Sequence, residues 1–184
     1  MRVRTLVTLL VVSVAAIPTT LPTMAVALAS PTAAVAPVGP GHFSTAARVV
    51  HRAPSPAPNV TGIRVGHHPS FDRVVVDLAG AAPGFDVRYV RRLVRDPSGK
   101  TVDLLGPASL RLVLRPANGH DPNSGTSTLR TPARTKWKLD QVRETAVIGD
   151  FEAVFTVGIG VARRAPFRVL TLRHPTRIVV DVRH

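Results

Sequence analysis

A six-residue pattern occurs twice in this chain, and the two copies restrict the possible folds more than any other feature. Arg73–Leu78 and Arg177–Val182 each run Arg, three β-branched residues, Asp and an aliphatic residue, and each follows a His-Pro pair. Alternate residues of a strand point to opposite faces, and β-branched residues favour extended backbone. We therefore predict two core strands of one kind near the two limits of a β domain. The residues expected to face inward are Val74, Val76 and Leu78 in the first copy and Ile178, Val180 and Val182 in the second; those expected to face outward are Arg73, Val75 and Asp77, and Arg177, Val179 and Asp181.

The two copies also suggest a register. If they are antiparallel neighbours, Arg73 faces Asp181 and Asp77 faces Arg177, which makes two reciprocal cross-strand pairs of opposite charge. Within one strand, four residues span about 13 Å, so Arg73 cannot reach Asp77. The alternative is that the two strands lie in different sheets and are related only by pseudo-symmetry.

Seven further segments have the length and composition of short strands. Turn signals separate them, among them the strong signal Asp96-Pro97-Ser98-Gly99, and residues 115–135 have the composition of a long polar loop. No useful window shows a helical period. We predict an all-β fold, a single antiparallel β-sandwich or partly open barrel of about nine short strands. The seven segments are Val60–Val65, Phe85–Val90, Thr101–Leu104, Leu110–Leu114, Val142–Ile148, Ala153–Val161 and Phe167–Leu172.

The first 58 residues differ in composition from the rest of the chain. A basic start, an apolar run over Leu6–Ile17 and the small residues around Ala27 and Ala29 predict a secretory signal peptide at 1–29, the alternative being an uncleaved anchor. Residues 30–58 are rich in Pro and Ala, which predicts a disordered spacer, either a functional stand-off or an inert tail. The β domain is then expected over 59–184. The chain has no Cys, which excludes disulfides and thiolate metal sites.

The charge of the chain is strongly positive. The formal net charge is +13, and loss of Arg2 and Arg4 with the signal peptide would leave 22 basic residues against 11 acidic ones, a charge of +11. Because the chain is expected to be secreted, we do not expect a nucleic-acid partner or a transmembrane segment in the mature protein. Anionic envelope polymers and phospholipid head groups are better matched to this charge.

Several segments together resemble the AMIN-like domain of exported actinobacterial proteins. The resemblance covers about Val60–Val182, and its motifs are fold motifs rather than catalytic signatures. It implies a small β-sandwich, related to the AMIN domains beside cell-wall amidases and pilus secretins, that localises by binding the cell wall. No amidase domain follows here, so we expect the module to act alone. The segments are Val60–Gly66, Arg73–Asp77, Pro83–Val90, Gly149–Glu152, Val157–Gly160, Pro166–Val169 and Arg177–Val182.

The residues themselves favour binding over catalysis. The chain has no nucleophile elbow and no phosphate-binding Gly-Lys-Ser/Thr loop. Four of the seven histidines, His67, His68, His120 and His174, lie in expected turns without a ligand pair at helical spacing. We therefore expect no catalytic residue, no metal and no cofactor. A cell-wall hydrolase is the less favoured alternative.

The candidate ligand-binding residues combine positive charge with the only Trp. Lys136, Trp137 and Lys138 form a basic–aromatic–basic triplet that can stack on a sugar ring and engage anionic groups. Arg73 and Arg177 add charge on one predicted sheet face. Trp137 has a structural alternative, as a plug at one end of the sandwich, since Trp is highly buried on average. The function expected is an exported envelope-binding module; a docking partner of another exported protein is the alternative.

Overall fold

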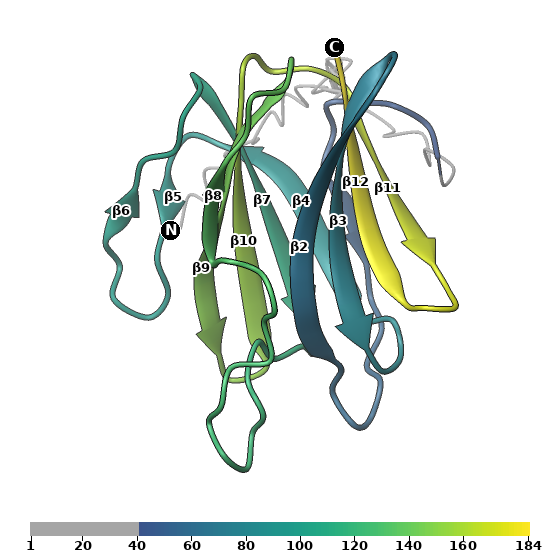
Figure 1. Ribbon diagram of the computed structural model, residues 1–184, viewed down its shortest axis with the longest axis vertical. Helices are drawn as coiled ribbons and strands as arrows, with labels where there is room; N and C mark the ends of the chain where they lie inside the picture. The colour runs from purple at the N-terminus through teal and green to yellow at the C-terminus, as the bar shows by residue number, and fades with distance from the viewer. Residues whose placement is uncertain (1–40) are drawn as a thin grey trace, which may run out of the picture. The chain divides into compact units, whose positions relative to one another are not determined.

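The computed structural model describes residues 41–184, and all regular elements among these residues are β-strands (Figure 1). The predicted signal peptide at 1–29 and residues 30–40 of the predicted spacer lie outside the described residues. The strands are β1 (Arg48–Val50), β2 (Asn59–His68), β3 (Phe71–Ala79), β4 (Gly84–Val90), β5 (Leu93–Val94), β6 (Thr101–Val102), β7 (Ala108–Arg115), β8 (Arg134–Lys136), β9 (Val142–Phe151), β10 (Val154–Val161), β11 (Phe167–Leu172) and β12 (Arg177–Arg183).

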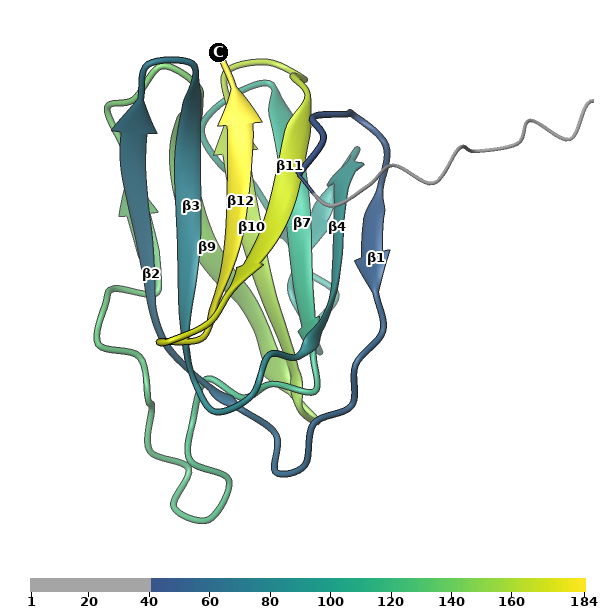
Figure 2. The same ribbon diagram turned by 90° about the vertical axis from the view of Figure 1, so that its right-hand side faces the viewer.

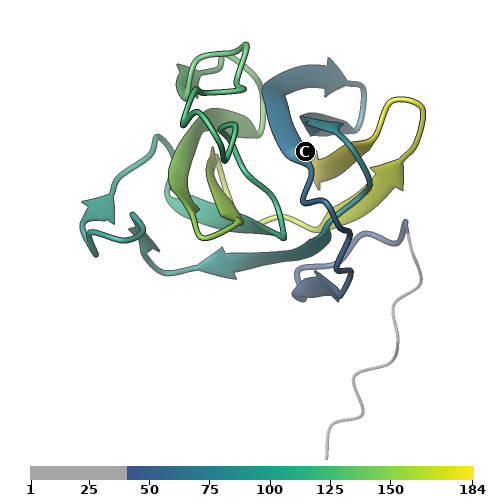
Figure 3. The ribbon, with the colours of Figure 1, turned by 90° about the horizontal axis from the view of Figure 1, so that it is seen from below.

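The strands form two facing antiparallel sheets and one small hairpin. The larger sheet has six strands in the order β1-β4-β7-β10-β9-β8, and the smaller has four in the order β11-β12-β3-β2. β5 and β6 pair only with each other and lie to one side of the larger sheet (Figures 1 and 3). Neither sheet closes on itself, so of the two predicted architectures the molecule is the sandwich, and the all-β prediction is confirmed.

All nine predicted strands are present. The three additional strands are β1, β5 and β8, which contain only two or three residues each. A period of two residues cannot be recognised over such a length, so these strands depend on pairing with neighbours rather than on a local pattern.

The core lies between the two sheets and is built by alternate residues of their strands. β3 and β12 are adjacent and antiparallel, in the predicted register: Arg73 lies opposite Asp181, and Asp77 lies opposite Arg177. The two copies of the six-residue pattern are therefore neighbours in one sheet rather than strands of different sheets. The six residues predicted to face inward are all buried in the main core: Val74, Val76, Leu78, Ile178, Val180 and Val182.

Two residues lie on the outer face as predicted and are nevertheless buried. Val179 and Asp181 are fully covered, although neither belongs to the main core. β12 is flanked by β3 and β11, which place Val75 and Leu170 on either side of Val179. A central strand is shielded by the side chains of its neighbours, and here those side chains are long enough to exclude water.

The second half of the segment expected as a spacer, 30–58, contains one strand, β1. β1 pairs with β4 and extends the larger sheet (Figure 2). Upstream of β1, Ser44 and Phe167 exchange two backbone hydrogen bonds of 2.9 Å. The Pro-rich composition of this segment did not predict a strand. Pro is excluded from central strands but tolerated in edge strands, and β1 is an edge strand. These contacts join residues upstream of the expected boundary at residue 59 to both sheets.

Candidate functional site

The outer face of the larger sheet is half covered by the β5–β6 hairpin. Leu93 and Val102 of the hairpin pack on Ala146 and Ile148 of β9, forming a second, smaller apolar core. Gly160 of β10 permits this close approach, because a Cβ there would lie 2.3 Å from the carbonyl oxygen of Leu105. The hairpin therefore seals one part of this face and leaves the other part open.

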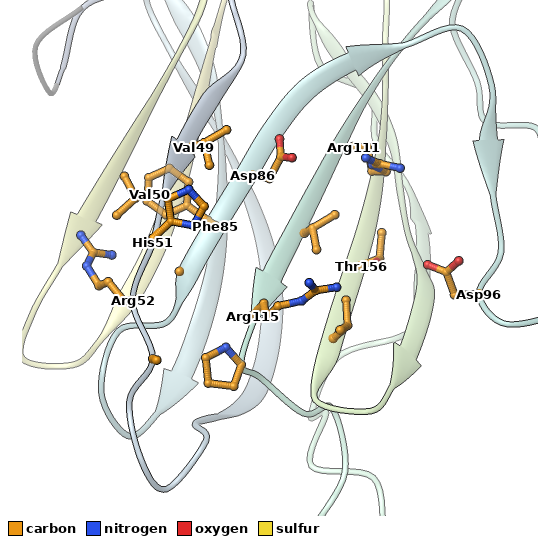
Figure 4. Close-up of a pocket in the computed structure, with 15 residues that line it drawn as sticks. Val49, Val50, His51, Arg52, Phe85, Asp86, Asp96, Arg111, Arg115 and Thr156 are labelled. Atoms are coloured by element: carbon orange, nitrogen blue, oxygen red, sulfur yellow. The ribbon is translucent and has the colours of Figure 1, made fainter. Parts of the chain in front are cut away.

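The open part is a groove with a volume of about 710 Å³, which we call the outer groove (Figure 4). One wall is formed by β1 and the residues that follow it, and Asp96 lies on the opposite side, next to the β5–β6 hairpin. Strands β4, β7 and β10 form the floor. The floor residues that point outward are Asp86, Arg111, Val113, Arg115, Val154 and Thr156.

The wall at β1 is held close to the floor by a glycine. A Cβ on Gly84 would lie 2.8 Å from the carbonyl oxygen of Val50 and 2.9 Å from the backbone nitrogen of Arg52. The side chain of Arg52 is anchored in turn: its Nη1 donates to the carbonyl oxygen of Pro83 at 3.1 Å and to Thr171 Oγ1 at 3.3 Å. Any larger residue in place of Gly84 would push this wall away from the groove.

Two arginines on the floor carry charge that no described residue neutralises. Arg111 and Arg115 make no ion pair within residues 41–184, and Nε of Arg111 is buried without a hydrogen-bond partner. By contrast, the carboxylate of Asp86 accepts two hydrogen bonds from Arg88, at 2.7 and 2.6 Å. A carboxylate or phosphate in the groove would bind the accessible guanidinium N–H groups of such arginines with bidentate geometry.

The predicted site residues Arg73 and Arg177 lie on the outer face of the other sheet. Arg73 donates to both oxygens of Asp181, at 2.6 and 2.9 Å, and Arg168 donates to the same carboxylate at 2.8 Å. The hydrogen bond with Asp181 raises the pKa of Arg73. One of the two predicted cross-strand pairs is thus formed, and its aspartate is shared by two arginines.

The second predicted pair is not formed, although its register is correct. Asp77 accepts from Arg64 of β2, at 2.6 and 2.8 Å, whereas Arg177 Nε donates to the carbonyl oxygen of Pro175 at 3.2 Å. The residue opposite Asp77 on β2 is Gly62, which has no side chain to keep Arg64 away. Asp77 therefore pairs across the other edge of β3.

The arginines of this face stack on aromatic rings that the sequence analysis did not assign to any site. Arg168 lies over Phe43 and Phe71, with its guanidinium carbon 4.6 and 5.2 Å from the two ring centroids. Arg183 lies 4.9 Å from the centroid of Phe43. Phe43 comes from the segment expected to be spacer, so this cluster could be found only once that segment was seen to fold. Because these cations are already engaged, the face is less available to a ligand than the outer groove.

The triplet around Trp137 begins at the last residue of β8, the strand at the edge of the larger sheet. Trp137 is half-buried against the main core, and its Nε1 donates to Thr145 Oγ1 at 3.0 Å. Lys136 and Lys138 are exposed on either side. The five predicted residues therefore come from two different sheets: the structure brings Arg73 and Arg177 onto one strand pair and places the triplet on the other sheet.

One cluster of possible metal ligands was missed in the sequence. His67 of β2 and His184 after β12 both lie against Asp72 Oδ1, with His67 Nδ1 at 3.1 Å and His184 Nε2 at 3.0 Å. Asp72 is fully buried; burial alone would raise its pKa, but the hydrogen bonds it accepts outweigh this and lower the pKa. The register expected for the two copies of the six-residue pattern could have indicated this cluster. It sets Asp72 opposite Val182, two residues before His184.

Comparison with known proteins agrees with the resemblance of the sequence motifs. No curated protein and no solved structure matches the chain. Among residues 41–184 there is no helix long and apolar enough to cross a membrane. The AMIN-like domain family matches residues 58–184, more than half of the chain, and such domains are in general non-catalytic, cell-wall-associated binding modules of exported proteins. The chain therefore belongs to the AMIN-like domain family.

Proposed function

We propose that this protein is an exported, non-catalytic module that binds an anionic polymer of the cell envelope, most simply the cell wall, in the outer groove. The observation that carries this proposal is the pair Arg111 and Arg115, which line the groove without an ionic partner among the described residues. A guanidinium without an ionic partner on the floor of a groove can bind carboxylate or phosphate groups.

The apolar residues of the groove support a polymer rather than a free anion. Val49, 45% exposed, lies on the wall, and Val113 and Val154 lie on the floor beside the arginines. Apolar side chains of this kind can cover the carbon faces of sugar rings while the arginines bind charged substituents. The predicted signal peptide and the expected mature charge of +11 fit the same proposal, since both favour an anionic partner outside the cytoplasm.

Charge reversal in the groove should abolish most of the binding. In co-sedimentation with purified cell wall at low salt, Arg111→Glu/Arg115→Glu should bind at least about tenfold more weakly than the unmodified protein. Each lost charge-assisted hydrogen bond contributes about 1.5–3 kcal/mol, and about 1.4 kcal/mol corresponds to a factor of ten.

The matched control is Arg91→Glu/Arg92→Glu, which makes the same change in net charge at two exposed residues outside the groove. This control should retain most of the binding. Equal losses in both double variants would show that net charge alone is responsible. A loss confined to Lys136→Glu/Lys138→Glu would instead assign binding to the triplet around Trp137 and reject the groove.

Salt should weaken the binding without removing it. Raising the ionic strength from 0.1 to 1 M shortens the screening length from about 10 Å to about 3 Å, which weakens the attraction between the domain and the polymer. Contacts with Val49, Val113 and Val154 should leave a salt-resistant remainder. The measurement is co-sedimentation across a salt series, with soluble muropeptides assayed in the same supernatants. Affinity that does not change with salt would contradict an electrostatic site, and release of muropeptides would contradict a non-catalytic one.

A further inference from the structure

At one end of the smaller sheet, three potential ligands converge from separate strands. The nearest ligand atoms of His67, Asp72 and His184 all lie within 4.8 Å of one another, and the two imidazole rings are stacked, with centroids 5.0 Å apart and planes inclined by 10°. His67 lies in β2 and Asp72 lies in β3. His184 directly follows β12. Two imidazoles and one carboxylate form a donor set typical of zinc and similar divalent transition metals.

We propose that His67, Asp72 and His184 form a binding site for a divalent transition-metal ion of the zinc class. Zinc with bonds of about 2.0–2.1 Å holds tetrahedral ligand atoms roughly 3.3 Å apart. The two separations between nitrogen and carboxylate oxygen, 3.1 and 3.0 Å, are already close to this value. The separation between the two nitrogens can be adjusted by His67, because 49% of its side chain is exposed and can rotate.

The carboxylate is prepared for this role by the backbone of the opposite sheet. Asp72 Oδ2 accepts hydrogen bonds from the backbone N–H groups of Gln141, at 2.6 Å, and Val142, at 2.9 Å. These two bonds occupy one carboxylate oxygen and orient the other, Oδ1, toward both histidines. Fixed partners behind a ligand of this kind are a regular feature of metal sites, where they set the orientation of the ligand.

A metal ion accounts for the arrangement of the three side chains better than hydrogen bonds alone. Both imidazole nitrogens approach the same oxygen, so two N–H donors would share Oδ1, while a metal would replace both protons and bind all three atoms. The side chain of His67 also keeps the site in contact with solvent, which gives an ion a route of entry and leaves room for a water ligand. Metal binding here would connect β12 to the β2–β3 hairpin and, through Asp72, to β9.

The test is titration of Zn²⁺ into the full chain carrying no histidine tag, followed by calorimetry and by thermal unfolding. We expect one ion per chain and a rise in Tm with Zn²⁺ concentration, because an ion that binds only the folded state stabilises it. His67→Ala and His184→Ala should each weaken binding at least tenfold and remove most of the Tm rise. Co²⁺ should give a visible absorption band in the unmodified protein that both variants lose.

The matched control is His42→Ala, which removes an exposed histidine outside the cluster. It should bind Zn²⁺ as the unmodified protein does. If His184→Ala fails to fold, His67→Ala decides the question, since its half-exposed side chain can be removed without opening the core. The proposal is overturned if Zn²⁺ does not bind, or if binding and the Tm rise persist in His67→Ala.

Discussion

Asp181→Ala should lower the free energy of unfolding by about 3 kcal/mol, whereas Asp77→Ala should lower it by less than about 1 kcal/mol. The two aspartates occupy equivalent positions in the two copies of the six-residue pattern, so they form a matched pair. Asp181 is fully buried and binds Arg73 and Arg168, whose side chains each remain only 26% exposed. Removing it leaves two largely covered cations without a partner.

Asp77 is more exposed than Asp181 and binds one arginine rather than two. Its ion pair with Arg64 has similar distances, but 56% of the Arg64 side chain is exposed, and water replaces the lost partner at little cost. The expected loss for Asp181 lies at the lower end of the range for breaking a buried ion pair, since its arginines retain some contact with water.

Chemical denaturation of both variants at neutral pH measures the difference, and a double-mutant cycle with Arg73→Ala measures the coupling between Arg73 and Asp181. We expect a clear coupling energy, because the two side chains share two hydrogen bonds. Equal stability losses at Asp77 and Asp181, or a coupling energy near zero, would contradict this description of the sheet face.

Trp137→Ala should also lower the free energy of unfolding by about 3 kcal/mol. The indole packs against the main core, and its removal would leave both a cavity and an unpaired Thr145 hydroxyl. The control is the neighbouring Lys138→Ala, which should change stability by less than about 0.5 kcal/mol because Lys138 is exposed.

Thermal unfolding and cell-wall co-sedimentation of the same Trp137→Ala preparation separate the two roles considered for this residue. A destabilised variant that still binds the wall below its Tm would identify Trp137 as a core residue. An unchanged Tm together with lost binding would place it in the ligand site instead.

How much of the fold was predictable from the sequence depended on the length of each element. Strands such as Phe71–Ala79 and Arg177–Arg183 contain enough alternating residues to reveal both their conformation and the face that each residue occupies. Their shared pattern even predicted the register that sets Arg73 opposite Asp181. β1 is too short for such a pattern, so this strand was not predicted from the sequence.

The sequence by itself determined the all-β class, the nine predicted strands, the inward faces of the two repeated strands and the family, because alternation and turn signals are local properties of the chain. Only the tertiary structure decided which polar groups meet. The partner of Asp77 depended on the missing side chain of Gly62 on the neighbouring strand. The outer groove and the cluster around Asp72 likewise combine residues from three or more strands, and contacts of this kind are set by packing and register rather than by spacing along the chain.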